Sequence, residues 1–239
     1  MGMSGTLTIA ATPIGNAGDA SARLRDALVE ADVIACEDTR KLQRLLNDLS
    51  LRTTARFVVY HDVNERKQAP KLVESLVDGK SVLLITDAGT PLISDPGYEL
   101  IRNAIAAGVQ VRVLPGPSAA LAALTLSGLP PDRFVFEGFL PKKSGARKTR
   151  LRDLARDSRT FIVYETSRNL PRTLQELAEV VEPDRKVFIA RELTKVHEEQ
   201  LRGPLGQLIA SLEGRTLKGE VVLVVEGLTR AKRLRPNKT

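Results

Sequence analysis

Residues 81–97 read SVLLITDAGTPLISDPG, an apolar run that passes directly into a segment of small, acidic, Gly and Pro residues. The first six residues have the length and composition of a buried strand. The loop that follows contains Asp87 and Gly89, and glycine lets a ligand approach the backbone closely. This order of strand and loop is typical of a parallel α/β sheet, because such sheets bind ligands beyond the carboxyl ends of their strands.

Short apolar runs alternate with amphipathic stretches on both sides of this segment. Strands are expected at 7–11, 33–36, 57–60, 81–86 and 110–114, with helices at 20–30, 41–49, 66–77 and 98–107. Strands separated by helices of this length predict βαβ units, a parallel sheet and helices on both of its faces.

The pattern changes after Pro115-Gly116-Pro117, which is the best candidate for a linker. Helices are expected at 119–127, 148–156, 170–181 and 204–212, and strands at 134–137, 160–165, 186–190 and 220–226, with a possible extra strand at 198–202. This spacing predicts a second α/β domain with a mixed sheet. We therefore expect an N-terminal domain over 1–116 and a C-terminal domain over 117–228. The basic tail 229–239 lacks apolar periodicity and is expected to be disordered.

The composition is that of an ordinary globular chain, with 42% hydrophobic and 27% charged residues among 239. No apolar run is long enough to span a membrane, and the first residues lack the features of a secretory signal. A single cysteine, Cys36, excludes an intramolecular disulfide and a cysteine-based zinc site, and the presence of only two histidines argues against a histidine-rich metal site. We expect no metal and a reducing, cytoplasmic location.

The net charge is +7, and a basic chain favours polyanionic partners. One basic cluster contains Lys142, Lys143, Arg147 and Lys148, and with Arg40 these are the candidates for phosphate contact. The alternative is a solvated charged face that binds nothing. Aromatic residues are only 4% of the chain, which argues against an extended aromatic groove for single strands.

Five consecutive predicted strands end in small, polar or charged residues. The five segments are 12–16 (TPIGN), 37–40 (EDTR), 61–65 (HDVNE), 87–97 (DAGTPLISDPG) and 115–119 (PGPSA). Any one of them could be an ordinary turn, but together they predict a ligand site at one edge of the sheet. A dinucleotide fingerprint and a P-loop are both absent, which excludes the two commonest nucleotide sites.

These segments, in this order, resemble the tetrapyrrole methylase superfamily, and within it the branch that methylates the 2′-oxygen of a cytidine ribose in 16S ribosomal RNA. Further matching motifs are EGFLPK at 137–142, YE at 164–165, ARELTK at 190–195 and KGE at 218–220. The resemblance covers residues 6–228. It implies S-adenosylmethionine as cofactor, a cleft between the two α/β domains, a homodimer, and the small ribosomal subunit as substrate without DNA or membrane partners.

The resemblance also implies which residues contact the cofactor. They are Pro13, Gly15, Asp87, Ala88, Gly89, Thr90, Pro91, Leu92, Pro115, Gly116, Ser118 and Ala119 in the first set of loops, and Glu165, Thr166, Ala190 and Glu220 in the second domain.

Methyl transfer to a hydroxyl depends on orientation and is helped by a general base. The candidates are His61, Asp62, Glu37 and Lys195, and histidine suits the task because it titrates near neutral pH. His61 could instead only cap a strand end, and the Glu37-Asp38 pair could hold Arg40 or Lys41. Two rival functions remain open at this point: carbon methylation of a tetrapyrrole, and a non-catalytic RNA-binding assembly factor.

Overall fold

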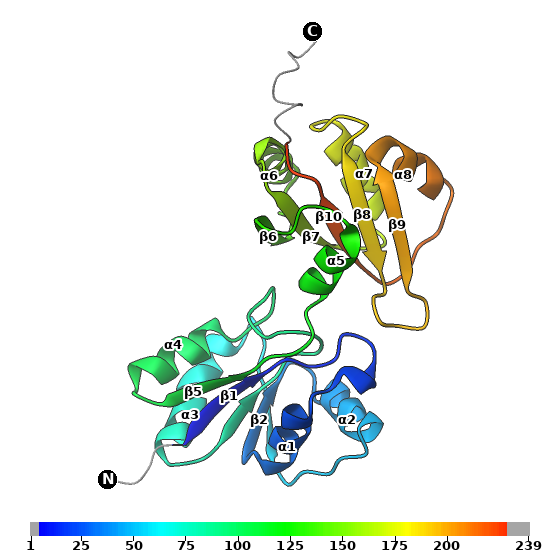
Figure 1. The fold of residues 1–239 in the computed structure, drawn as a ribbon. Helices are drawn as coiled ribbons and strands as arrows, with labels where there is room; N and C mark the ends of the chain where they lie inside the picture. Colours follow the sequence, from blue (N-terminus) through cyan, green and yellow to red (C-terminus); the bar gives the residue numbers. More distant parts are fainter. Residues whose placement is uncertain (1–4, 229–239) are drawn as a thin grey trace. The chain divides into compact units, whose positions relative to one another are not determined.

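The structure is a computed structural model and describes residues 5–228 (Figure 1). The basic tail predicted to be disordered, 229–239, lies outside the described residues. The chain divides into two compact units between Ser118 and Ala119. Within the described range, no helix is both long and apolar enough to cross a lipid bilayer.

The first unit is built on a five-stranded sheet in which every neighbouring pair is parallel. Its strands are β1 (Thr6–Ala10), β2 (Val33–Cys36), β3 (Arg56–Val59), β4 (Val82–Leu84) and β5 (Gln110–Leu114). They lie in the order β3-β2-β4-β1-β5, so β3 and β5 are the edge strands. The predicted parallel sheet is confirmed.

Four helices cover the two faces of this sheet, as Figure 1 shows. They are α1 (Ala22–Glu30), α2 (Thr39–Asp48), α3 (Glu65–Val77) and α4 (Tyr98–Ala106). Leu7 and Ile9 of β1 pack in one core with α3 and α4, whereas Leu83 and Ile85 pack in the other with α1 and α2. Successive residues of a strand point to opposite faces, so strands that are apolar on both sides form two cores.

The second unit contains a five-stranded mixed sheet, which confirms the predicted sheet type. Its strands are β6 (Phe134–Phe139), β7 (Thr160–Thr166), β8 (Lys186–Arg191), β9 (Glu199–Pro204) and β10 (Glu220–Val225). The order is β6-β7-β10-β8-β9, with β6 parallel to β7 and all other neighbours antiparallel. The possible extra strand at 198–202 is therefore present as β9.

The helices of the second unit are divided unequally between the faces of its sheet. They are α5 (Ala119–Ser127), α6 (Ser144–Arg156), α7 (Leu170–Ala178) and α8 (Leu205–Leu212). Helices α6, α7 and α8 share one core with Phe161 and Val163 of β7. Helix α5, which is apolar all round, packs on β7, β8 and β10. Helices therefore cover both faces of the sheet at the central strands β7, β10 and β8.

Several predicted boundaries are wrong, including the end of helix α7 (Leu170–Ala178), which was predicted at 181. Helix α1 begins only after Ser21, whose Oγ accepts a hydrogen bond from the Leu24 N–H (3.1 Å), while 17–19 form a short 3₁₀ helix, η1 (Ala17–Asp19). Strand β4 is three residues long, shorter than the predicted 81–86. Strand β6 runs on to Phe139 through an irregularity between Phe136 and Gly138. Helix α6 starts at 144, four residues before the prediction.

Candidate functional site

Hydrogen bonds join the loops after β1, β4 and β5 at the carboxyl edge of the first sheet. Thr12 and Gly89 exchange two backbone hydrogen bonds, with N···O distances of 2.9 and 3.1 Å. The Thr12 hydroxyl donates to the carbonyl of Thr86 (3.2 Å), and the Thr90 hydroxyl donates to the carbonyl of Pro117 (3.0 Å). Three of the five predicted ligand loops therefore form one connected backbone surface.

Two glycines in these loops have a conformational or steric requirement. Gly89 has a φ of +86°, a region that side chains with a Cβ rarely adopt. A Cβ at Gly116 would lie 3.1 Å from the Cβ of Ala11, closer than ordinary packing contact. Both loops therefore depend on glycine to hold their present paths.

The loop after β2 joins the same group through carboxylates. The Asp87 N–H donates to Glu37 Oε1 (3.0 Å), and Lys41 Nζ pairs with Asp87 Oδ2 (2.8 Å). Asp38 caps α2 and pairs with Arg40 (2.7 Å). The alternative that this acidic pair holds Arg40 is confirmed for Asp38. Lys41 was not among the predicted site residues, although it follows Arg40 directly.

Burial raises the pKa values of two side chains at this edge. It raises the pKa of Glu37, and the nearby charges of Asp87 and Asp62 add to the effect. Burial also raises the pKa of the Cys36 thiol to about 12, and again Asp87 adds to it. Glu37 and Asp62, two predicted catalytic residues, therefore lie within electrostatic reach of one another.

The backbone of His61 is fixed while its side chain remains available. The His61 N–H donates to Asn64 Oδ1 (2.9 Å), and its carbonyl accepts from the N–H groups of Asn64 and Glu65. Within the described part of the chain, the imidazole has no hydrogen-bond partner. Glu65 instead connects loops, because its carboxylate accepts from the Tyr60 hydroxyl and the Gly97 N–H (both 3.2 Å).

Lys195, the fourth predicted catalytic residue, belongs to the second unit and is held by two carboxylates. Its Nζ lies 2.9 Å from Glu192 and 2.7 Å from Glu220. Burial alone would lower the pKa of Lys195, but the two carboxylates outweigh burial and raise that pKa. The two carboxylates therefore favour the protonated, positively charged form of Lys195, and its catalytic role stays a prediction.

Two buried hydroxyls at the ends of β7 and β8 lack partners. Among the described side chains, Ser167 Oγ and Thr194 Oγ1 are buried without a hydrogen bond. Thr194 has a φ of +65° and Glu192 a φ of +52°, conformations that cost energy in residues other than glycine. Unpaired buried polar groups are unfavourable unless a ligand or water satisfies them. Neither hydroxyl was among the predicted site residues. Ser167 follows β7 directly and Thr194 lies in the loop after β8, and these positions were the available signal.

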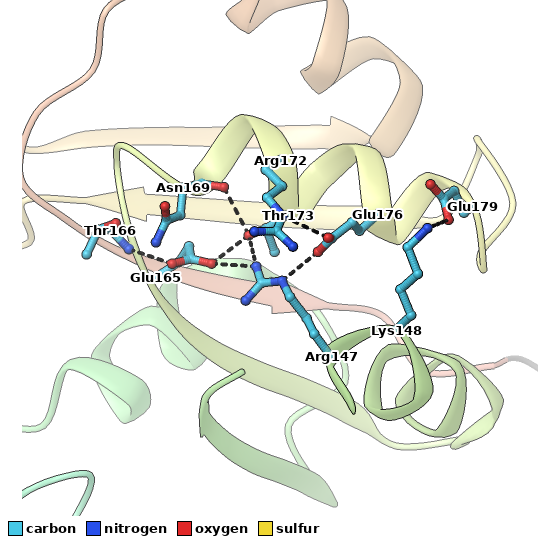
Figure 2. Close-up of polar contacts among 9 residues, drawn as sticks. All are labelled: Arg147, Lys148, Glu165, Thr166, Asn169, Arg172, Thr173, Glu176 and Glu179. Atoms are coloured by element: carbon cyan, nitrogen blue, oxygen red, sulfur yellow. Dashed lines mark hydrogen bonds and ion pairs between the residues drawn. The ribbon is translucent and has the colours of Figure 1, made fainter. Parts of the chain in front are cut away.

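Glu165 is part of a buried ion-pair network centred on Arg147 (Figure 2). Arg147 lies 2.8 Å from Glu165 and 2.5 Å from Glu176, and Thr173 donates a hydrogen bond to Glu165 (2.6 Å). Burial alone would raise the pKa of Glu165, but the hydrogen bonds from Thr173 and Arg147 outweigh it and lower that pKa. The network fixes the end of β7, since Glu165 also accepts from the Thr166 N–H (3.0 Å).

The structure contradicts the prediction that Arg147 contacts RNA, because its guanidinium is buried between carboxylates and cannot reach a polyanion. Lys148 is paired with Glu179 (2.9 Å), as Figure 2 also shows. Arg40 is exposed but paired with Asp38. Lys142 and Lys143 are exposed just before α6. The predicted basic cluster therefore offers less available charge than its sequence suggested.

The remaining predicted cofactor residues differ in accessibility. Gly15, Ala88, Pro115, Gly116, Thr166 and Glu220 are exposed, Pro91 and Ala190 are buried, and Pro13, Leu92, Ser118 and Ala119 are intermediate. Three or more side chains suited to a metal ion do not gather anywhere in 5–228.

Residues 6–209 match the family described as Tetrapyrrole (Corrin/Porphyrin) Methylases, and the chain belongs to this family. It is 46% identical over 224 residues to the Ribosomal RNA small subunit methyltransferase I of Mycobacterium tuberculosis (strain ATCC 25618 / H37Rv), with 94% of this chain and 78% of the relative covered. The corresponding protein of Vibrio cholerae is 47% identical over 223 residues, with 92% and 77% covered.

Solved structures show the same fold. The methyltransferase CobJ superposes with a TM-score of 0.70 at 24% identity, covering 93% of this chain and 94% of that one. The uroporphyrin-III C-methyl transferase of Thermus thermophilus complexed with S-adenyl homocysteine gives a TM-score of 0.64 at 20% identity, covering 92% and 96%. These two likenesses concern the fold alone.

Proposed function

We propose that this protein transfers a methyl group from S-adenosylmethionine to the 2′-hydroxyl of a cytidine ribose in 16S ribosomal RNA of the small subunit. The observation that carries the proposal is the connected loop surface at the carboxyl edge of the first sheet, found in a chain 46% identical to a named ribosomal RNA methyltransferase. Ligands of open α/β sheets bind at this edge. We also propose that the protein acts in the cytoplasm as a homodimer, which sedimentation would test.

The residues present fit a nucleoside-containing cofactor. The exposed backbone of Gly116 allows close approach to the loop after β5, and Gly89 gives the loop after β4 a path that few other residues could adopt. In the second unit, the buried hydroxyls of Ser167 and Thr194 need hydrogen-bond partners. In this proposal, the loops 87–92 and 115–119 hold the cofactor. When bound, S-adenosylmethionine supplies a methyl group on a positively charged sulfur.

The contribution of the chain is to orient the acceptor hydroxyl and to remove its proton. Orientation alone can supply much of the rate enhancement for such a transfer. The His61 imidazole, which has no partner among the described residues, is the proposed base. Glu37 is the other candidate, because its raised pKa makes its carboxylate a better proton acceptor than an ordinary glutamate.

An isotope-transfer assay tests the proposed function. The protein is incubated with S-adenosylmethionine carrying a labelled methyl group and, in separate reactions, 16S rRNA, small ribosomal subunits and a tetrapyrrole. We expect label on a cytidine ribose in one of the RNA samples. Label on the tetrapyrrole alone would identify a carbon methyltransferase instead. No calorimetric binding of S-adenosylmethionine would favour a non-catalytic RNA-binding factor.

Substituting Gly89 by Val should weaken S-adenosylmethionine binding by about tenfold or more, since a strained φ costs about 1–2 kcal/mol and the added side chain alters the loop. Calorimetric titration measures the affinity. Gly108→Val is the matched control, because Gly108 has a φ of +70° and open space around it. The control should lose similar stability and keep its affinity. Equal affinity in both variants would remove this loop from the proposed cofactor site.

A further inference from the structure

Positive charge gathers in the segment from 39 to 71 of the first unit. This segment contains eight Lys or Arg residues and three Asp or Glu residues, so it carries most of the chain's net charge of +7. Arg52, Arg56 and Lys71 are exposed, and none of them forms an ion pair with a described residue. Their charge is therefore available to a partner, unlike that of Arg147, Lys148 or Arg40.

These three cations surround the edge strand β3 and two hollows that flank it. One hollow, of about 550 Å³, is bordered by Arg52 and by the carboxamide side chains of Gln43 and Asn47 on α2. The other, of about 300 Å³, is bordered by Arg56 and Lys71. Phe57 lines both hollows.

The chemistry of this region matches unpaired RNA. Arginine and lysine contact phosphates, an aromatic ring stacks on a base, and carboxamides form hydrogen bonds with base edges. Half-buried Phe57 supplies the ring, and exposed Gln43 and Asn47 supply the carboxamides. The larger hollow has more than enough room for one base.

The direction of β3 connects this region to the proposed active site. The strand ends at Val59, and His61 and Asp62 follow at the carboxyl edge, where the ligand loops meet. An RNA strand lying along β3 would therefore approach His61 at one end.

We infer that Arg52, Arg56, Lys71 and the two hollows, here named the β3 edge, form a contact surface for an unpaired segment of ribosomal RNA. The inference rests on the proposed function and extends it, because the predicted RNA contacts were Arg40 and the cluster at 142–148. An acidic protein or a second copy of the chain could also meet a basic edge strand. The aromatic ring of Phe57 and the two neighbouring carboxamides of Gln43 and Asn47 favour RNA.

The test compares Arg52→Gln/Arg56→Gln with Lys80→Gln/Arg112→Gln in the full-length protein. The control removes the same charge from the first unit away from β3, since Arg112 is on the opposite edge strand β5 and Lys80 precedes the central strand β4. Filter binding measures the dissociation constant for 16S rRNA across a salt series. We expect the β3-edge variant to bind about tenfold more weakly, and its log–log salt slope to fall by about 1.4, at roughly 0.7 per phosphate contact.

The same samples separate failure of this inference from failure of the proposed function. Wild-type protein that neither binds nor methylates 16S rRNA would overturn the function. Methylation by the wild type, with equal RNA affinity in both double variants, would overturn the β3 edge alone. A change in oligomeric state confined to the β3-edge variant, seen by sedimentation, would also overturn it and assign the edge to a second copy. In support, 4-thiouridine in the RNA should crosslink to peptides within 43–57.

Discussion

Replacing Arg147 by Met should lower the free energy of unfolding by about 3–5 kcal/mol at pH 7, because it leaves buried carboxylates without their cation. The side chains of Glu165 and Glu176 are only 5% and 8% exposed. Thr173 and Arg172 still contact them but cannot replace a central guanidinium that donates to both. Urea denaturation followed by circular dichroism measures the loss. The expected decrease is a large share of the free energy of unfolding of an ordinary domain.

Lys148→Met is the matched control, since Lys148 lies on the same helix and pairs with Glu179 at the surface. Pairs of this kind contribute at most about 1 kcal/mol. If Arg147→Met costs no more than Lys148→Met, the network does not stabilise the second unit.

The contribution of Glu165 and Glu176 to the free energy of unfolding should decrease as the pH falls. Burial opposes ionisation of Glu165 and Glu176. Hydrogen bonds from Thr173 and Arg147 to Glu165, and from Arg147 and Arg172 to Glu176, nevertheless hold both pKa values below the ordinary value. Their contribution to stability is therefore present above the ordinary glutamate pKa and is lost as pH falls through the lowered values. In Arg147→Met, protonating these carboxylates relieves the cost of burying their charge. The difference in the free energy of unfolding between wild type and variant should therefore become smaller as pH falls from 7 to 4.

His61→Ala should slow methyl transfer by about 10²-fold or more, since a positioned general base contributes about 10²–10⁴-fold. The affinity for S-adenosylmethionine should be unchanged, because the cofactor loops are joined to one another and not to the imidazole. Single-turnover transfer to 16S rRNA measures the rate, and calorimetry measures the affinity.

Histidine itself provides the control for this prediction. His197, the other histidine, is exposed in the second unit, and His197→Ala should transfer at the wild-type rate. Added imidazole should partly restore transfer by His61→Ala, which a purely structural role would not allow. An unchanged rate in His61→Ala would move the role of base to Glu37, and Glu37→Gln would then lose activity.

Much of the fold could be predicted because the strands are short, apolar and separated by clear turns. The bounds of β2, β5 and α5 agree with the predicted 33–36, 110–114 and 119–127. Strand order could not be predicted, since β4 pairs with both β1 and β2, which are distant in sequence. Boundaries were missed where a single side chain decided them, as Ser21 does for α1.

The candidate site was predicted as a set of loops better than as a set of side chains. Glycine and proline after the first, fourth and fifth strands indicated the surface that Thr12, Gly89 and Thr90 join. Arg147 is buried and paired because of Glu165 and Glu176, which are 18 and 29 residues away in sequence and contact it only in the folded chain. Charge clusters in sequence do not distinguish a paired cation from an available one.

The burial of Cys36 has a practical consequence. Only the thiolate is nucleophilic, and a pKa of about 12 leaves almost none at neutral pH. Because this is the only cysteine in the chain, the native protein should resist maleimide dyes. A cysteine introduced in place of exposed Thr54, between Arg52 and Arg56, would then be the single reactive group, without prior mutation of the native thiol. A fluorophore attached there would report ligand arrival at β3 in real time.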